Sequence, residues 1–187
     1  MMFQSLWTLG LSWDSPLPPK ISKQWRSWQE ELKKPSQIKL SRPWLSRSVK
    51  QVHIFGDASQ AAYAASAYLG VESLDGEISV KLMIAKTRVT PVRHISLPRL
   101  ELMAALLCER LKNNIVKEVT LLIQETLYWS DSKVVLAWIR GSSKRWKPFV
   151  ANRVEEIQSV VSPRQWKYCP TKEKQQIYPV EDAHWMN

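Results

Sequence analysis

The chain has 187 residues, 44% of them apolar, which is enough sequence for one domain with a substantial core and an extension. A formal net charge of +10 and a pI of about 9.7 favour a polyanionic partner, most simply a nucleic acid. Two cysteines exclude a disulfide framework, and without metal-ligand spacing they do not indicate zinc. No apolar run approaches transmembrane length, so we expect no membrane partner and a reducing compartment, the cytoplasm or alternatively the nucleus.

Residues 1–50 differ in composition from the rest of the chain. They hold five of the ten tryptophans, and nine basic residues against three acidic ones. The alternating stretch 6–13 predicts a half-buried strand, and apolar residues at helical spacing predict a short amphipathic helix over 21–34. We interpret the segment as one that packs on the following domain or on a neighbouring protein.

Residues 51–170 alternate between predicted strands and helices. Short connections make the first three strands antiparallel neighbours, and Pro98 suits the first turn of a long helix. Three strands followed by helix, strand, helices and strand are typical of a mixed-sheet α/β domain. The predicted strands are 52–57, 61–69, 78–89, 125–131 and 165–170, and the predicted helices are 98–119, 132–141 and 147–161.

Three carboxylates occupy matching places in this pattern. Asp57 ends the first strand, Glu101 lies one turn into the long helix, and Asp131 ends the fourth strand. If the first and fourth strands are adjacent and parallel, both aspartates emerge at one end of the sheet. Glu101 joins them there if the long helix crosses that end. Converging carboxylates repel one another unless cations hold them, and Mg²⁺ prefers oxygen ligands. Two such ions about 4 Å apart suit a phosphodiester displacement.

Each acid also has a purely structural alternative. Asp57 could be a turn residue, Glu101 could interact with the helix dipole, and Asp131 could cap a helix N-terminus. Taken singly, these alternatives are at least as good as metal ligation. Their joint placement at the ends of the elements favours the metal site.

Basic residues gather in two stretches that contain no acids, 81–99 and 132–153. Trp138 and Trp146 are interleaved in the second stretch, where the alternative for both is packing in the core. Basic clusters beside a metal site are what binding of a phosphate backbone requires. The residues predicted to bind nucleic acid are Lys86, Arg88, Arg93, Arg99, Lys133, Arg140, Lys144, Arg145 and Lys147.

Long ordered motifs resemble the ribonuclease H region of BEL/Pao-type retrotransposon polyproteins. They are FGDAS, SLPRLELMAALL, YWSDSKVVLAWIRGSSKRWKPFVANRVEEIQ and QWKYCPTKE, and the opening LWTLGLSWDSPLP resembles the connector that follows the reverse transcriptase. The resemblance implies a Trp-rich connector over residues 1–50 and a ribonuclease H-like domain over residues 51–170, with a five-stranded mixed sheet and flanking helices.

The same resemblance implies an activity and its partners. It implies cleavage of the RNA strand of an RNA–DNA hybrid with two Mg²⁺ ions, for which Mn²⁺ can substitute. The first three acids of the family correspond to Asp57, Glu101 and Asp131, as catalytic residues and metal ligands. In an intact polyprotein the reverse transcriptase module is the expected partner.

Residues 171–187 depart from the family. The family ending Asp-Leu-Ser-Arg-Gly, which carries the fourth metal ligand, does not occur there. One choice of synonymous codons from Gln176 onward, read in a shifted frame, restores Asp-Leu-Ser-Ser-Arg-Gly-Cys-Thr-Leu-Asp-Glu. We therefore interpret this tail as frameshifted, and Asp182 receives no role. Without the fourth carboxylate we expect a second ion to bind poorly and activity to be weak or lost.

Two rival functions follow. One is a catalytically inactive nucleic-acid-binding remnant of a retrotransposon polyprotein. The other is an aspartic peptidase, since proteins with this region are also catalogued under a Pao retrotransposon peptidase label. A retroviral-type peptidase needs Asp-Thr-Gly or Asp-Ser-Gly, whereas the chain has Asp57-Ala58-Ser59 and no second candidate. The residues argue against that chemistry.

Overall fold

The computed structural model describes residues 2–33, 49–72, 78–119 and 123–170. The chain divides into two compact units, Met1–Leu45 and Ser46–Asn187. The predicted tail at 171–187 lies outside the described residues. Within the described ranges, no helix is long and apolar enough to cross a membrane.

In its described residues, 2–33, the first unit contains two helices, α1 (Met2–Thr8) and α2 (Pro19–Glu31). The strand predicted over residues 6–13 is therefore wrong. Gly10 adopts a φ of 62°, and its amide donates to Trp7 O at 3.3 Å, as in a common helix C-terminal signal. The alternation of apolar residues resembles a strand, but within this unit the described residues offer no other strand with which to pair.

Helix α2 confirms the predicted amphipathic helix. Pro19 occupies its first turn, where a missing amide costs no hydrogen bond. Ile21 is buried, and the rings of Trp25 and Trp28 lie 5.1 Å apart. The two tryptophans thus pack along one side of the helix, three residues apart.

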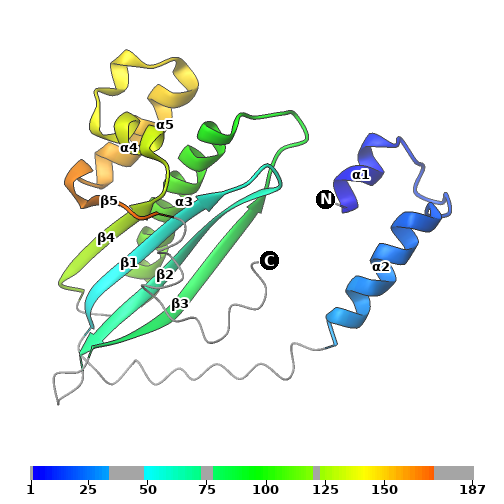
Figure 1. Cartoon of the computed structure of the whole chain (residues 1–187), viewed down its shortest axis with the longest axis horizontal. Coiled ribbons are helices and arrows are strands. Elements are labelled where there is room, and N and C mark those ends of the chain that lie inside the picture. Colours follow the sequence, from blue (N-terminus) through cyan, green and yellow to red (C-terminus); the bar gives the residue numbers. More distant parts are fainter. Residues whose placement is uncertain (1, 34–48, 73–77, 120–122, 171–187) are drawn as a thin grey trace. The chain divides into compact units, whose positions relative to one another are not determined.

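The second unit is built on a five-stranded sheet of order β3-β2-β1-β4-β5. β2 pairs antiparallel with β1 and β3, whereas β1, β4 and β5 run parallel (Figure 1). The predicted α/β mixed sheet of ribonuclease H-like topology is confirmed. The elements are β1 (Val49–Ala58), β2 (Ala62–Glu72), β3 (Ile78–Val89), α3 (Leu97–Glu118), β4 (Glu125–Ser130), α4 (Lys133–Arg140), η3 (Ser143–Arg145), α5 (Pro148–Val160), η4 (Pro163–Gln165) and β5 (Trp166–Tyr168).

Helix α3 covers β1 and β2 on one face of the sheet and also packs against α5. Alternate residues of β1, Val52 and Ile54, are almost completely buried beneath it. Leu100, Leu102 and Leu111 of α3 are also almost completely buried, because the helix contacts both the sheet and α5. The core therefore lies on this side of the sheet.

Gly56 lets α3 approach β1 closely. A Cβ atom at this position would lie 2.9 Å from Cys108 Sγ and 3.2 Å from the backbone carbon of Ala104. Both distances are shorter than ordinary van der Waals contacts, and the Ala104 atom belongs to the helix backbone. The absence of a side chain at Gly56 therefore sets the height of α3 above the strand.

The other face of the sheet carries an aromatic cluster around Phe55. Its ring stacks on Trp129 with centroids 5.8 Å apart and meets Tyr68 edge-on at 5.8 Å. Cys169, just after β5, is buried against the same cluster. These contacts join β2, β1, β4 and the residue after β5.

A chain of hydrogen bonds runs beside this cluster. Trp129 Nε1 donates to His53 Nδ1 at 3.2 Å, so His53 Nε2 carries the proton and donates to Gln51 Oε1 at 3.1 Å. Gln51 Nε2 in turn donates to Glu125 Oε2 at 2.9 Å. Burial lowers the pKa of His53, while Glu125 acts in the opposite direction. The neutral imidazole thus links β1 to β4.

Replacing Gly56 should strain the α3–β1 contact. We expect Gly56→Ala to lower the free energy of unfolding by about 1–3 kcal/mol, the usual cost of overpacking a core. Gly70→Ala is the matched control, because its Cβ would be 3.6 Å or more from its neighbours. Urea unfolding measures both; equal stability of the two variants would contradict the constraint.

The free energy of unfolding should decrease toward acidic pH because of His53. Its pKa in the folded chain lies below the ordinary 6.5, so between these values the unfolded chain binds more protons. The free energy of unfolding should therefore decrease as pH falls from about 7 to about 5. The structural cause is that protonation of His53 Nδ1 removes the acceptor of the Trp129 hydrogen bond. His53→Gln should flatten this decrease, whereas His94→Gln, in an exposed loop, should not. Denaturant midpoints across pH test it.

Candidate active site

The structure brings Asp57 and Asp131 to neighbouring positions. In the parallel register of β1 and β4, Gly56 pairs with Ser130, and each aspartate is the next residue. Adjacent strands lie about 4.8 Å apart, so these aspartates leave the sheet side by side at its carboxyl end. The sequence argument required that the first and fourth strands be adjacent and parallel, and β1 and β4 are.

Glu101 lies at the same end of the sheet. β3 runs in the same direction as β1, so the chain that leaves its final residue enters α3 at that end (Figure 1). Ala104 lies over Gly56, and Glu101 is three residues earlier on the same side of the helix, one turn nearer the N-terminus. That turn lies in the direction of Asp57.

Serines take most of the structural tasks proposed as alternatives for the aspartates, although Asp57 Oδ1 also accepts a hydrogen bond from the amide of Ala58 at 2.8 Å. Ser132 caps α4 by accepting a hydrogen bond from Val135 N at 3.3 Å, so Asp131 is not the cap. Ser59 Oγ accepts from the amides of Ala61 and Ala62 at 3.2 Å in the turn after β1. These serines and Gly56 position the site, and sequence reasoning missed all three, although a serine directly before a predicted helix is a recognisable cap.

Glu101 is the fifth residue of α3, and the first turn of that helix carries no acid. A simple favourable interaction with the helix N-terminus falls off within the first turn, so this alternative does not account for its place. Asp57 is exposed, and Glu101 and Asp131 are half-buried. The carboxylates therefore lie at the border between core and solvent.

The three carboxylates are ligands of the type that a hard divalent cation prefers, but the described residues do not form a complete metal site. Across residues 2–33, 49–72, 78–119 and 123–170, no group of three or more His, Cys, Asp or Glu side chains is arranged to hold a metal ion. Mg²⁺ commonly takes only one or two protein carboxylates and completes its shell with water and substrate phosphates. The Asp57–Asp131 pair fits that pattern.

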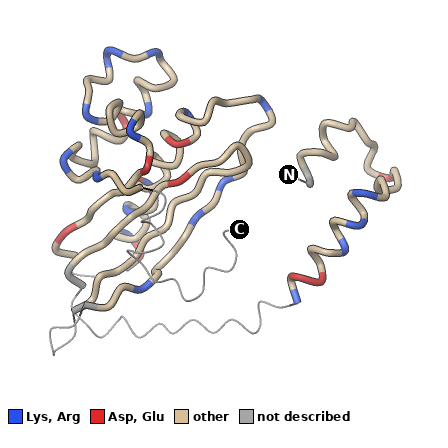
Figure 2. The backbone as a smooth tube through the Cα atoms, in the orientation of Figure 1, with Lys and Arg blue, Asp and Glu red and all other residues tan. Residues whose placement is uncertain are grey.

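Basic residues surround this end of the sheet. Lys86 and Arg88 lie near the end of β3, Arg93 and Arg99 lie between β3 and the first turn of α3, and Lys133 begins α4. Figure 2 shows further basic positions around α4 and α5. By the bounds of the elements, Arg140 ends α4, Lys144 and Arg145 belong to η3, and Lys147 directly precedes α5. The structure thus places the first five predicted residues at the carboxylate end and the other four along the α4–α5 segment.

Some of these residues also support the fold. Arg140 Nη2 donates to Trp166 O at 3.2 Å, which ties α4 to β5. The rings of Trp138 and Trp146 lie 6.3 Å apart, and both side chains are half-buried. Arg145 lies over the Trp146 ring at 5.7 Å. Both tryptophans are therefore packed, and they hold a basic loop in place.

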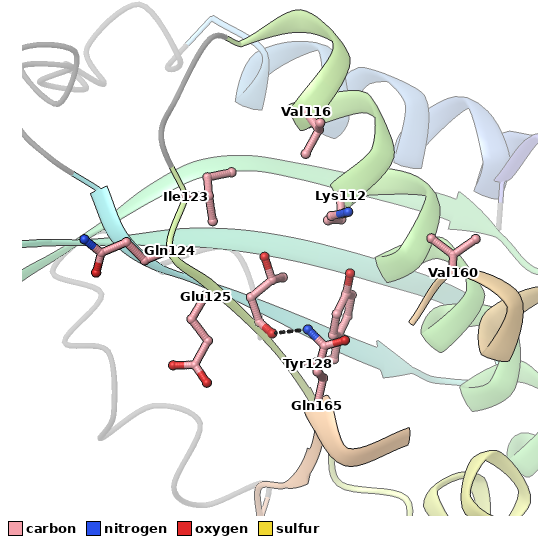
Figure 3. Close-up of a pocket in the computed structure, with 9 residues that line it drawn as sticks. Lys112, Val116, Ile123, Gln124, Glu125, Tyr128, Val160 and Gln165 are labelled. Carbon is pink, nitrogen blue, oxygen red and sulfur yellow. Dashed lines mark hydrogen bonds between the residues drawn. The ribbon is translucent and has the colours of Figure 1, made fainter. Parts of the chain in front are cut away.

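A pocket of about 330 Å³ lies elsewhere, where β4 begins (Figure 3). Lys112, Glu125 and Tyr128 line it, and Gln165 Nε2 donates to Thr126 O at 3.0 Å beside it. β4 runs from this pocket toward Asp131, so the pocket and the carboxylates lie at opposite ends of the strand. The pocket is separate from the candidate active site.

Comparison with solved structures gives weak global similarities. An RNase H1 from Halobacterium salinarum NRC-1 has 12% identity and a TM-score of 0.41, over 67% of this chain and 89% of that one. The N-terminal RNase H domain of a Mycobacterium tuberculosis protein has 18% identity and a TM-score of 0.39, over 69% and 88%. A foamy viral protease-reverse transcriptase in complex with RNA/DNA hybrid has 10% identity and a TM-score of 0.44, over 84% of this chain and 25% of that one.

No curated protein shows a significant match to the sequence. In contrast, the sequence pattern of one family matches residues 1–132, which is more than half of the chain. The matched range includes Asp57, Glu101 and Asp131. The protein therefore belongs to the Pao retrotransposon-like RNaseH-like domain family.

Proposed function

We propose that the protein is a divalent-metal-dependent nuclease that cleaves the RNA strand of RNA–DNA hybrids. The observation that carries this proposal is the parallel register of β1 and β4, which sets Asp57 beside Asp131. The close passage of α3 over Gly56 adds Glu101 from a third element. Basic residues around the same edge supply the charge that a nucleic-acid backbone requires.

Asp57, Glu101 and Asp131 are the proposed catalytic residues and metal ligands. Mg²⁺ is the proposed cofactor, and Mn²⁺ is able to substitute. Two divalent ions bound there would stabilise the attacking and leaving oxygens of a phosphodiester displacement. Without the fourth carboxylate of the family the second ion should bind poorly, so we expect the cleavage to be weak. The protein's own contribution is to hold the carboxylates on rigid elements and to orient the hybrid through the basic residues.

A second candidate is a nucleic-acid-binding domain without catalytic activity. It is favoured by the lack, among the described side chains, of a three-ligand group arranged for metal. The basic surface around α4 and α5 would serve this function equally well (Figure 2). Cleavage with metal added distinguishes the two candidates.

We further propose a division of the chain by role. Residues 1–50 act as the connector that follows a reverse transcriptase module, residues 51–170 as the nuclease domain, and residues 171–187 as a frameshifted tail. The reverse transcriptase module is the proposed partner in an intact polyprotein. Cys108 and Cys169 are both buried and are not joined in a disulfide, which suits a reducing compartment such as the cytoplasm.

The decisive prediction concerns hybrid cleavage. With Mg²⁺ or Mn²⁺, Asp57→Asn, Glu101→Gln and Asp131→Asn should each reduce cleavage of a labelled RNA–DNA hybrid by about a hundredfold or more, since bound metal contributes several kcal/mol. Glu118→Gln, in the last turn of the same helix α3, is the matched control and should retain activity.

Binding must be measured on the same samples. Cleavage lost in the three variants while hybrid remains bound supports the nuclease. A wild-type chain that binds hybrid but cleaves it with neither metal ion would instead establish the binding domain and contradict the nuclease.

A further inference from the structure

Phe149, at the start of α5, lies between two arginines from different elements. The guanidinium carbon of Arg153 is 3.7 Å from the centre of the Phe149 ring, and that of Arg99, in the first turn of α3, is 5.1 Å from it. Because both distances end at the same centroid, the two Cζ atoms can be no farther apart than their sum. One aromatic ring thus orients two cations at the α3–α5 junction.

Glu156, three residues after Arg153 on α5, acts electrostatically on Arg153, but its carboxylate accepts a hydrogen bond from Arg110 Nη2 at 2.6 Å. In the described part of the chain neither Arg99 nor Arg153 forms an ion pair. Arg153 has five N–H donors, of which Nη1 donates to Phe149 O at 2.8 Å. Donors therefore remain for a ligand.

The arginine pair lies next to the candidate active site. Arg99 lies in the first turn of α3, which begins at the carboxyl end of β1, although Arg99 and Glu101, two residues apart, project to different sides of the helix. Arg153 meets the same Phe149 ring as Arg99, so its guanidinium group lies at this end of α3 as well. Both guanidinium groups are thus near the carboxyl end of β1.

We propose that Arg99 and Arg153, oriented by Phe149, form a phosphate-binding site that grips the nucleic-acid backbone beside the candidate active site. This inference rests on the proposed function and adds Arg153 and Phe149 to the residues considered so far. A guanidinium presents a planar fork of donors that matches two phosphate oxygens, and stacking on the ring fixes its direction. Arg99 is exposed and Arg153 is half-buried, so a phosphate can reach both.

The test measures binding of an RNA–DNA hybrid in EDTA, so that nothing is cleaved, as a function of salt. Each phosphate contact contributes about 0.9 to the slope of log K against log salt concentration. Arg99→Gln and Arg153→Gln should each reduce the slope by about this amount, and the double variant by about twice as much. Arg164→Gln, exposed on η4 at the opposite end of the sheet, is the control and should leave the slope unchanged.

Two variants separate orientation from charge. Phe149→Leu keeps the net charge, and it should weaken binding several-fold because the guanidinium groups lose their platform. Arg153→Lys also keeps the charge, and it should weaken binding with little change of slope because the fork is lost. Melting curves accompany every variant, and if Arg153→Gln fails to fold, Arg99→Gln and Arg153→Lys decide the question.

The outcomes are distinct. If the wild type binds hybrid and the arginine variants show the same salt slope as the wild type, the phosphate site is wrong. The proposed nuclease function is not contradicted by that result. An equal loss in Arg164→Gln also overturns it, because the effect would then be one of general charge. A wild type that binds no hybrid at any salt concentration overturns both proposals.

Discussion

The close contact between α3 and β1 at Gly56 is the constraint on which the rest of the structure depends. A side chain there would collide with Cys108 and with the backbone of Ala104, so the helix height is fixed by a missing atom. That height sets where Glu101 lies relative to the ends of β1 and β4. It also sets where α5, which packs against α3, can place Phe149. The packing of α3, the placement of the carboxylates and the contacts of Phe149 are thus linked through a single position.

The carboxyl end of the sheet combines opposite charges in a small region. Acids lie at the strand ends, and basic residues lie on the strands, loops and helix starts around them. Under the proposed function, the basic surroundings would attract a polyanionic strand, and the central acids would repel it unless cations bind there. The aromatic rings beside several basic residues restrict their long side chains, which lowers the entropy that these side chains have left to lose.

Much of this could be predicted from the sequence. Periodicity placed the strands and helices of the second unit, and the order of elements gave the sheet class, because β-branched runs and Pro98 mark their boundaries clearly. Alternation misled at residues 6–13, where Gly10 ends a helix, because alternation alone cannot show whether a partner strand exists. Asp57, Glu101 and Asp131 were singled out by position, but the register that sets the aspartates side by side depends on pairing between distant strands. The Phe149 contacts were not predictable, because they depend on how α5 packs against α3.

The pairing of β1 with β4 also governs the order in which the protein can assemble. β1, β2 and β3 follow one another closely and pair as local hairpins, whereas residues joined across β1 and β4, such as Gln51 and Glu125, are 74 positions apart. Closing so long a loop costs more entropy, and such pairings are formed slowly. During synthesis the three-stranded meander can therefore form while α3 and β4 are still being made. The two aspartates meet only when β4 docks, so the carboxylate end of the sheet forms after the three-stranded scaffold that supports it.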